Sequence, residues 1–211
     1  MPNRLITITD ALERLRAGNE RFATGQTTRP YFTHEILKSH AQTPQRPLAT
    51  VLACSDSRVP VEVLFDCGVG DLFVLRIAGA VCTRELAGTI ELGIEALKTP
   101  LVLVMGHTGC AAVTEALSSR APTPNMQPII ARLERGLRRA RIDTGQANPA
   151  PPDAVSVAAC VWGTIRDLYQ TSEIIRSAAK QGLIAVHGAV YDLEAGRVNF
   201  LGSHPEEAAL L

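Results

Sequence analysis

Two short motifs carry side chains that commonly bind metals. Cys54, Asp56 and Arg58 alternate with serines in the first motif, and His107 and Cys110 flank Thr-Gly in the second. Two thiols, an imidazole and a carboxylate suit Zn²⁺, which accepts soft sulfur, borderline nitrogen and oxygen. Arg58 lies two positions after Asp56 and can hold that carboxylate when it leaves a metal. The pattern therefore predicts a zinc site in which the oxygen ligand can come and go.

Four short apolar runs indicate where these motifs lie in the fold. They span residues 48–53, 72–77, 101–105 and 183–191. Continuous apolar strands are typical of a parallel sheet that is covered on both faces. Helical patterns lie between the runs, over residues 61–66, 84–98, 111–118 and 153–180. This alternation predicts an α/β fold with a mostly parallel sheet. Residues 197–201 follow a turn and are expected to pair antiparallel with the fourth strand.

Both motifs follow predicted strands. Cys54 comes directly after the first strand, and His107 follows the third, with only Gly106 between them. Ligands bind at the carboxyl ends of parallel strands, so the motifs face each other if these two strands are neighbours. Cys110 opens a helix, whose dipole favours a thiolate. A closed structural zinc site with four ligands is the alternative, but it leaves Arg58 without a role.

The N-terminal region is predicted to be helical. Thr9-Asp10 is an N-cap candidate, apolar residues then recur at near-helical spacing, and Gly25 ends the pattern. Whether this helix packs on its own sheet or on another subunit stays open at this stage. We expect a single domain over residues 1–211, with a helical arm over about residues 9–41.

The composition argues against several classes of function. Lys plus Arg and Asp plus Glu each number 21, so no overall field attracts nucleic acid or an acidic membrane. No stretch approaches the ~18 apolar residues of a membrane span, and no secretory signal is recognisable. The cysteine count is five, which fits metal binding or burial in a reducing compartment. Cys67, Cys82 and Cys160 are interpreted as buried thiols. These features predict a soluble, cytoplasmic protein.

Both motifs resemble signatures of the β-class carbonic anhydrases. Residues 53–60, with the sequence Ala-Cys-Ser-Asp-Ser-Arg-Val-Pro, are similar to the first signature. Residues 106–110, Gly-His-Thr-Gly-Cys, are similar to the second. Further similarity lies in residues 17–22, 70–76, 88–91 and 183–192. The resemblance spans roughly residues 10–202, nearly the whole chain.

The resemblance implies a zinc enzyme. Cys54, His107 and Cys110 would hold a single Zn²⁺ per chain, and Asp56 would be either a fourth ligand or the partner of Arg58. The implied reaction is the reversible hydration of carbon dioxide to bicarbonate and a proton, by attack of zinc-bound hydroxide. Asp56, held by Arg58, would orient that hydroxide by accepting its hydrogen bond.

Two further residues match substrate-binding positions of the family. Gln45 matches a glutamine that hydrogen-bonds substrate in some members, and Phe73 matches an aromatic wall of the pocket. The family also implies a homodimer whose N-terminal helices embrace the partner, or a dimer of dimers forming a homotetramer. The chain departs from the family at Ala111, where most members have glycine, and at Leu92, where plant-type members have tyrosine.

Two alternative functions remain open. A zinc hydrolase of carbonyl sulfide or carbon disulfide would use the same fold and the same metal chemistry. A binding protein that holds zinc as a structural ion would retain the metal but have no catalytic activity, although Asp56 and Arg58 argue against it. A thiol redox protein is disfavoured, because Cys54 and Cys110 do not form a C-x-x-C pair.

Overall fold

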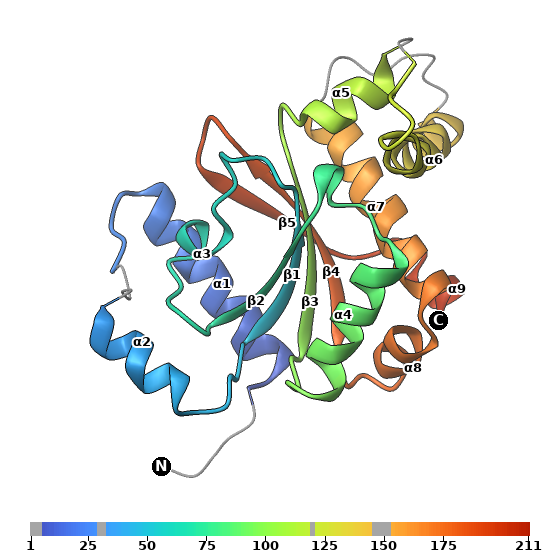
Figure 1. Cartoon of the computed structure of the whole chain (residues 1–211). Coiled ribbons are helices and arrows are strands. Elements are labelled where there is room, and N and C mark those ends of the chain that lie inside the picture. Colours follow the sequence, from blue (N-terminus) through green and yellow to red (C-terminus); the bar gives the residue numbers. More distant parts are fainter. Residues whose placement is uncertain (1–5, 29–32, 119–120, 145–152) are drawn as a thin grey trace.

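A five-stranded sheet forms the centre of the molecule (Figure 1). The structure is a computed structural model that describes residues 6–28, 33–118, 121–144 and 153–211. The strands, in the spatial order β2-β1-β3-β4-β5, are β1 (Ala49–Ala53), β2 (Leu72–Arg76), β3 (Leu101–His107), β4 (Ala185–Asp192) and β5 (Arg197–Ser203). Strands β1 to β4 pair in parallel, and β5 is antiparallel to β4. The predicted mostly parallel sheet with an antiparallel edge strand is confirmed.

Helices cover both faces of this sheet. Among the described residues they are α1 (Ile8–Ala23), α2 (His34–Ala41), α3 (Val61–Leu64), the 3₁₀ turn η1 (Ala78–Ala80), α4 (Arg84–Glu95), α5 (Ala111–Leu117), α6 (Gln127–Thr144), α7 (Ala154–Thr171), α8 (Glu173–Lys180) and α9 (Glu207–Leu210). Figure 1 shows α1 and α3 on one side of the sheet, and α4, α7 and α8 on the other. Within the described residues, no helix is both long and apolar enough to cross a membrane.

The apolar strands explain this two-sided cover. Successive side chains of a strand point to opposite faces. Val51 and Ala53 of β1 therefore join the cluster under α1 and α3, whereas Leu52 joins the cluster under α4 and α7. All three are fully buried. Full burial of a large aliphatic side chain contributes roughly 1.5–3 kcal/mol, so the central strands are rigid supports for the loops that follow them.

Helix α1 packs on the sheet of its own chain. Its residues Ala11 and Leu15 are fully buried in the same cluster as β1 and β3. The helix begins earlier than predicted, because Thr7 is the N-cap and forms a capping box with Asp10. Helix α2 buries no residue. Residues 29–32 of the predicted arm lie outside the described residues.

The single helix predicted over residues 153–180 is wrong, because Ser172 divides it into α7 and α8. The backbone of Ser172 is extended, with φ −125° and ψ 114°. Its hydroxyl oxygen accepts a hydrogen bond from the Ile175 N–H at 3.1 Å and donates to the Glu91 carboxylate at 2.6 Å. A capping serine with a partner on α4 thus turns the chain, and the apolar pattern alone does not reveal this contact.

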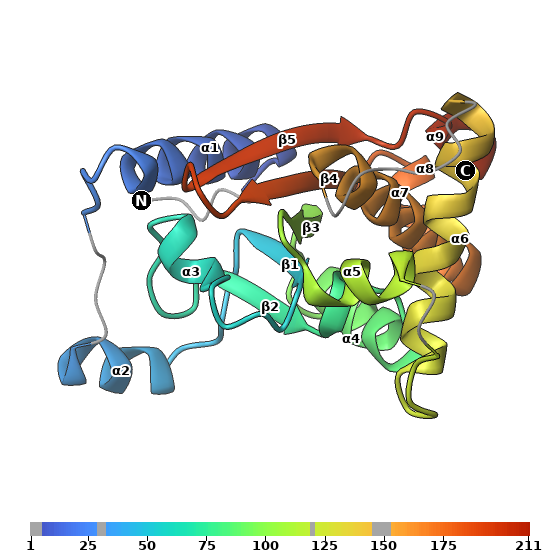
Figure 2. The same cartoon turned by 90° about the horizontal axis from the view of Figure 1, so that it is seen from above.

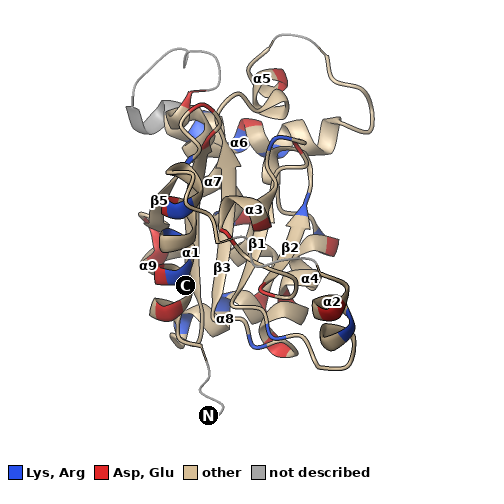
Figure 3. Cartoon of the chain, turned by 90° about the vertical axis from the view of Figure 1, so that its left-hand side faces the viewer, with Lys and Arg blue, Asp and Glu red and all other residues tan. Residues whose placement is uncertain are grey.

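Acidic and basic residues alternate along the ribbon on the side of the molecule that carries α1 and α2 (Figure 3). Across this face, the Arg197 guanidinium of β5 binds both carboxylate oxygens of Glu20 on α1, at 2.5 and 3.2 Å. Both side chains are more than half exposed, so this pair adds little stability. The mixture of signs agrees with the zero net charge of the sequence.

Candidate metal centre

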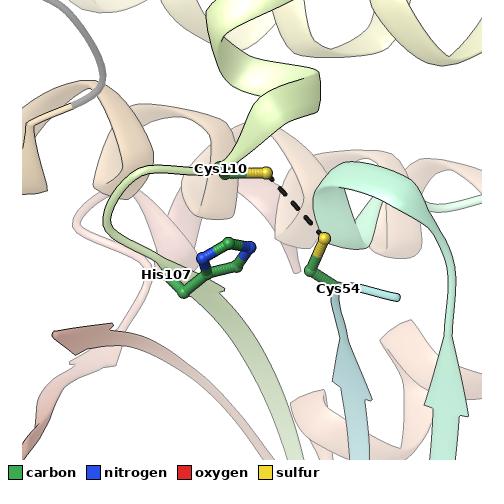
Figure 4. Close-up of side chains that lie close together, drawn as sticks. All are labelled: Cys54, His107 and Cys110. Carbon is green, nitrogen blue, oxygen red and sulfur yellow. Dashed lines mark hydrogen bonds between the residues drawn. The ribbon is translucent and has the colours of Figure 1, made fainter. Parts of the chain in front are cut away.

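The two motifs meet because β1 and β3 are neighbouring parallel strands. Residue Ala53, which ends β1, pairs with Met105 of β3. Cys54 follows β1 directly, His107 is the last residue of β3, and Cys110 is the N-cap of α5. The predicted adjacency of the two strands is confirmed, and the three side chains point toward one another (Figure 4).

Three potential ligand atoms converge at this edge of the sheet. One ligand atom each from Cys54, His107 and Cys110 lies within 4.8 Å of the other two. The two Sγ atoms are 3.8 Å apart, and all three residues are at most 5% exposed. A tetrahedral ion with metal–sulfur bonds of about 2.3 Å would separate its two sulfur ligands by about 3.8 Å. The spacing therefore fits a tetrahedral Zn²⁺ without rearrangement of the sulfur atoms.

The histidine is held in the form that suits a metal ligand. Its Nδ1 lies 2.9 Å from the carbonyl oxygen of Thr108, so Nδ1 carries the proton and Nε2 has a lone pair. Nε2 is buried and has no hydrogen-bond partner among the described residues. A buried nitrogen without a partner is costly, and a metal ion beside it would remove that cost. The hydrogen bond to Thr108 is the usual device that fixes a ligating histidine.

The two thiols cannot both ionise without a cation. The hydrogen bond from Cys110 lowers the pKa of Cys54, and His107 and backbone N–H groups act in the same direction. The resulting negative charge on Cys54, together with burial, raises the pKa of Cys110 far above its usual value. A buried pair of thiolates therefore requires a positive ion between them. Zn²⁺ supplies that charge, so the donor set fits the metal electrostatically as well as geometrically.

Asp56 lies beside the three ligand atoms but pairs with Arg58. The arginine Nε and a terminal nitrogen donate to the two carboxylate oxygens at 2.9 and 2.7 Å. This bidentate bond holds the pKa of Asp56 well below its usual range. Asp56 Oδ2 is also 3.8 Å from His107 Nε2. The carboxylate thus borders the metal position while Arg58 keeps it out of the ligand set.

Arg76 is a site residue that the sequence reasoning missed. Its side chain donates to the backbone carbonyls of Cys54 and Asp56, at 3.0 and 2.5 Å. It therefore fixes the loop that carries both motif residues. The backbone N–H of Gly79 also lies 3.4 Å from the Cys54 sulfur. An arginine that ends an otherwise apolar strand was the signal in the sequence, because a charged side chain at that position requires a partner.

Gln45 and Phe73 do not approach the metal position within one chain. Gln45 is exposed and precedes β1, whereas Cys54 follows it. The five-residue strand separates them by roughly 16 Å. Phe73 of β2 pairs with Thr50, three positions before Ala53 on β1, and packs under α4. Both side chains lie toward the opposite end of the strands.

A small cavity adjoins the three ligand residues. It has a volume of about 10 Å³ and is lined by the three ligand residues together with Gly79, Gly106, Val113, Val157, Cys160 and Val161. This is close to the least volume that holds a water molecule. Cys160 is buried here as predicted, and burial raises the pKa of its thiol to about 12. Cys160 is therefore a neutral wall of the cavity, distinct from the ligand pair.

Comparisons with known proteins identify relatives over most of the chain. Residues 49–198 match the family model described as carbonic anhydrase. A carbonic anhydrase of Mycolicibacterium smegmatis is 37% identical over 204 residues, which cover 92% of this chain and 93% of that protein. Carbonic anhydrase 2 of Mycobacterium tuberculosis is 31% identical and covers 89% of each chain. The crystal structure of a β-carbonic anhydrase of Aspergillus fumigatus superposes with a TM-score of 0.72, at 26% identity and 95% coverage of both chains.

Proposed function

The chain belongs to the carbonic anhydrase family, as a β-class member, and we propose that it catalyses the reversible hydration of carbon dioxide to bicarbonate and a proton. The observation that carries this proposal is the buried group of Cys54, His107 and Cys110 at the ends of β1 and β3. Relatives named carbonic anhydrase align with nearly the whole chain.

Cys54, His107 and Cys110 would hold the Zn²⁺. When bound, the ion lowers the pKa of a water molecule towards about 7 and so supplies a nucleophile at neutral pH. The two thiolates provide the negative charge that a buried dication requires. Thr108 keeps the His107 ring in one tautomer through its carbonyl oxygen. The burial of all three residues keeps bulk water away from the ligand atoms, so water would not readily displace them from the ion.

We assign an orienting role to Asp56. Its Oδ2 borders the metal position, and Arg58 holds both of its oxygens. A carboxylate with a depressed pKa stays ionised at neutral pH, so it can accept a hydrogen bond from the reacting water molecule but cannot donate one. This would direct the lone pair of the water oxygen at carbon dioxide. The arrangement supports the form of the site in which Asp56 is paired with Arg58 rather than bound to zinc.

The positions of Gln45 and Phe73 support a dimeric enzyme. Within one chain Gln45 lies a strand length from Cys54, too far for contact with a substrate at the metal. If these residues bind substrate, as the family resemblance implies, they do so from a second copy of the chain. We therefore propose a homodimer, alone or as half of a tetramer. Sedimentation of the purified protein tests this proposal, and a monomer with full activity would refute it.

Two alternatives share this site. A hydrolase of carbonyl sulfide or carbon disulfide would use the same ligands, but the relatives that align along the whole chain are named carbonic anhydrases. A silent binding protein would not need the bidentate Asp56–Arg58 pair. We also propose a cytoplasmic location, since all five cysteines are free and the ligand thiols must stay reduced.

The direct test is a measurement of turnover by zinc-loaded protein. Stopped-flow mixing with carbon dioxide and a pH indicator should show rapid proton release that the metal-free protein lacks. Parallel assays with carbonyl sulfide and carbon disulfide should show much slower turnover. Faster turnover of either sulfur compound would select the hydrolase, and a zinc-loaded protein inactive on all three substrates would select the binding protein.

A further inference from the structure

A second hollow lies on the far side of α7 from the metal centre. It is a groove of about 520 Å³ between α6, α7 and the segment that leads to α9, and Figure 2 shows these elements side by side. Cys160 and Val161 of α7 line the small cavity of the metal centre, whereas Trp162, Gly163 and Arg166 line the groove. The volume falls in the range of sites for small organic molecules.

The groove exists because α6 and α7 touch through their backbones. A Cβ atom on Gly136 of α6 would lie 2.7 Å from the carbonyl oxygen of Ala159, and one on Gly163 would lie 3.0 Å from the Cα of Gly136. Only glycine allows this approach. Ala140 and Ala159 extend the same floor. Small side chains thus leave open a space that larger residues would fill.

Arginines surround this floor. The lining includes four guanidinium groups and two carboxylates; these residues are Arg135, Arg138, Arg139, Arg166, Asp167 and Glu206. Arg138 also pairs with Glu134 just outside the lining, so the excess is one positive charge. The surplus belongs to the groove, because the chain as a whole has no net charge. This excess favours an anionic ligand.

Two of these arginines converge on one carboxylate. A terminal nitrogen of Arg139 donates to both oxygens of Glu206, at 2.9 and 3.2 Å, and a terminal nitrogen of Arg166 donates to one of them at 2.8 Å. The remaining N–H groups of both guanidiniums bond no described residue. Guanidinium forks bind phosphate in a bidentate manner, so this pair has donors to spare for an anion.

An aromatic surface stands beside the arginines. Trp162 is half-buried and meets the buried His204 edge-on, with ring centroids 5.4 Å apart. The backbone N–H of Glu206 donates to His204 Nδ1 at 2.9 Å, which fixes the imidazole. The indole therefore offers a rigid apolar face next to the charged rim.

We propose that this groove binds a small aromatic phosphate monoester, with its dianionic phosphate on Arg139 and Arg166 and its ring against Trp162. The proposal is separate from the carbonic anhydrase reaction, because it uses none of the residues of the metal centre. Size, charge and surface chemistry each support it: the volume admits a nucleotide-sized molecule, the positive excess and the spare guanidinium donors suit a phosphate, and the indole matches a ring.

Trp162 makes the test direct, because it is the only tryptophan of the chain. We would titrate the zinc-loaded protein with adenosine 5′-monophosphate and follow tryptophan fluorescence, with adenosine and inorganic phosphate as separate probes. The nucleotide should give a saturable change, and each half of it should bind about tenfold more weakly or worse. Added salt should weaken the binding of the nucleotide more than the binding of adenosine.

Variants locate the site. Arg166→Gln should weaken nucleotide binding about tenfold, since it removes a charge-assisted hydrogen bond. Arg138→Gln should weaken it about threefold and leave the fold intact, because the Arg138 side chain is 59% exposed and its ion pair within the described part of the chain is with Glu134 of its own helix. Arg197→Gln, which breaks a similar exposed pair on the α1 face, should bind as the wild type does.

Circular dichroism and zinc content serve as folding controls. If Arg166→Gln does not fold, the affinity of the Arg138→Gln protein for the nucleotide tests the proposal instead. The absence of a saturable change with the nucleotide would overturn the proposal. So would equal affinity for adenosine, or equal losses of affinity in the Arg138→Gln and Arg197→Gln proteins.

Discussion

Arg58 binds both carboxylate oxygens of Asp56, although the two residues stand only two positions apart in an exposed loop. The Asp56 carboxylate also accepts the backbone N–H of Arg58, at 2.9 Å. Three hydrogen bonds thus fix a carboxylate that borders the metal position. The loop itself is anchored by Arg76, which bonds the carbonyls of Cys54 and Asp56. The orientation of Asp56 is therefore built in before substrate arrives.

The first prediction concerns this carboxylate. Asp56→Asn keeps the shape of the side chain but replaces an oxygen acceptor with an amide donor. We expect kcat/KM for carbon dioxide hydration to fall about 10²-fold, while the zinc content stays that of the wild type. Stopped-flow kinetics and metal analysis measure the two quantities on the same sample.

The matched control is Arg58→Lys, which retains the charge but loses the bidentate fork. It should lie between the wild type and Asp56→Asn in kcat/KM. Loss of zinc in Asp56→Asn would instead show that the carboxylate is a metal ligand, and full activity would show that it has no role.

The second prediction separates the ligand cysteines from their neighbour. Cys110→Ser should reduce bound zinc to well below an equimolar amount, because serine is a poor ligand for Zn²⁺. Cys160→Ala should retain the metal, since the Cys160 thiol lines the same small cavity but lies outside the ligand group. A small loss of stability, about 1 kcal/mol, is expected for the cavity that Cys160→Ala creates. Zinc retained in Cys110→Ser, or lost in Cys160→Ala, would contradict this assignment.

The metal centre was largely predictable from the sequence. The ligand types, the strand ends that carry them and the adjacency of those strands follow from apolar runs and short spacings, since these are local features. The position of Ser172, which ends α7, was not predictable, because it depends on a contact with Glu91 that is distant in sequence. The same holds for Arg76, whose partners are carbonyl groups of a loop 20 residues away.

The histidines show a further limit of sequence reasoning. His204 is near the C-terminus, in a polar segment typical of the surface, yet it is 6% exposed. Its ring packs edge-on against Trp162, a contact that no periodicity reveals. The groove on α6 and α7 was hidden for a similar reason: the arginines of α6 look like a solvated helix face until α7 and Glu206 are placed beside them.

The third prediction concerns the attachment of α1. The side chain of Asn19 is 4% exposed; its amide donates to the carbonyls of Leu64 and Gly196, and its oxygen accepts the N–H of Val198. Asn19→Ala leaves these backbone groups without partners and should reduce the free energy of unfolding by about 2–4 kcal/mol. Urea denaturation measures this change. Asn199→Ala is the matched control, because Asn199 is an exposed asparagine of β5 and should change stability by less than about 0.5 kcal/mol.

The last prediction concerns the pH dependence of stability. Burial lowers the pKa of His187 on β4 below its usual value, and the charge of Arg16 acts in the same direction while Glu207 opposes it. The folded chain therefore binds fewer protons than the unfolded chain as the pH falls below about 6.5. Stability from this group is complete above that pH and declines below it. His187→Gln should flatten the pH dependence of the free energy of unfolding between about pH 7 and pH 5, with His34→Gln, an exposed histidine, as the control. Since His204 is shifted the same way, some dependence should remain in His187→Gln, whereas an unchanged slope would show that His187 is not buried in the neutral form.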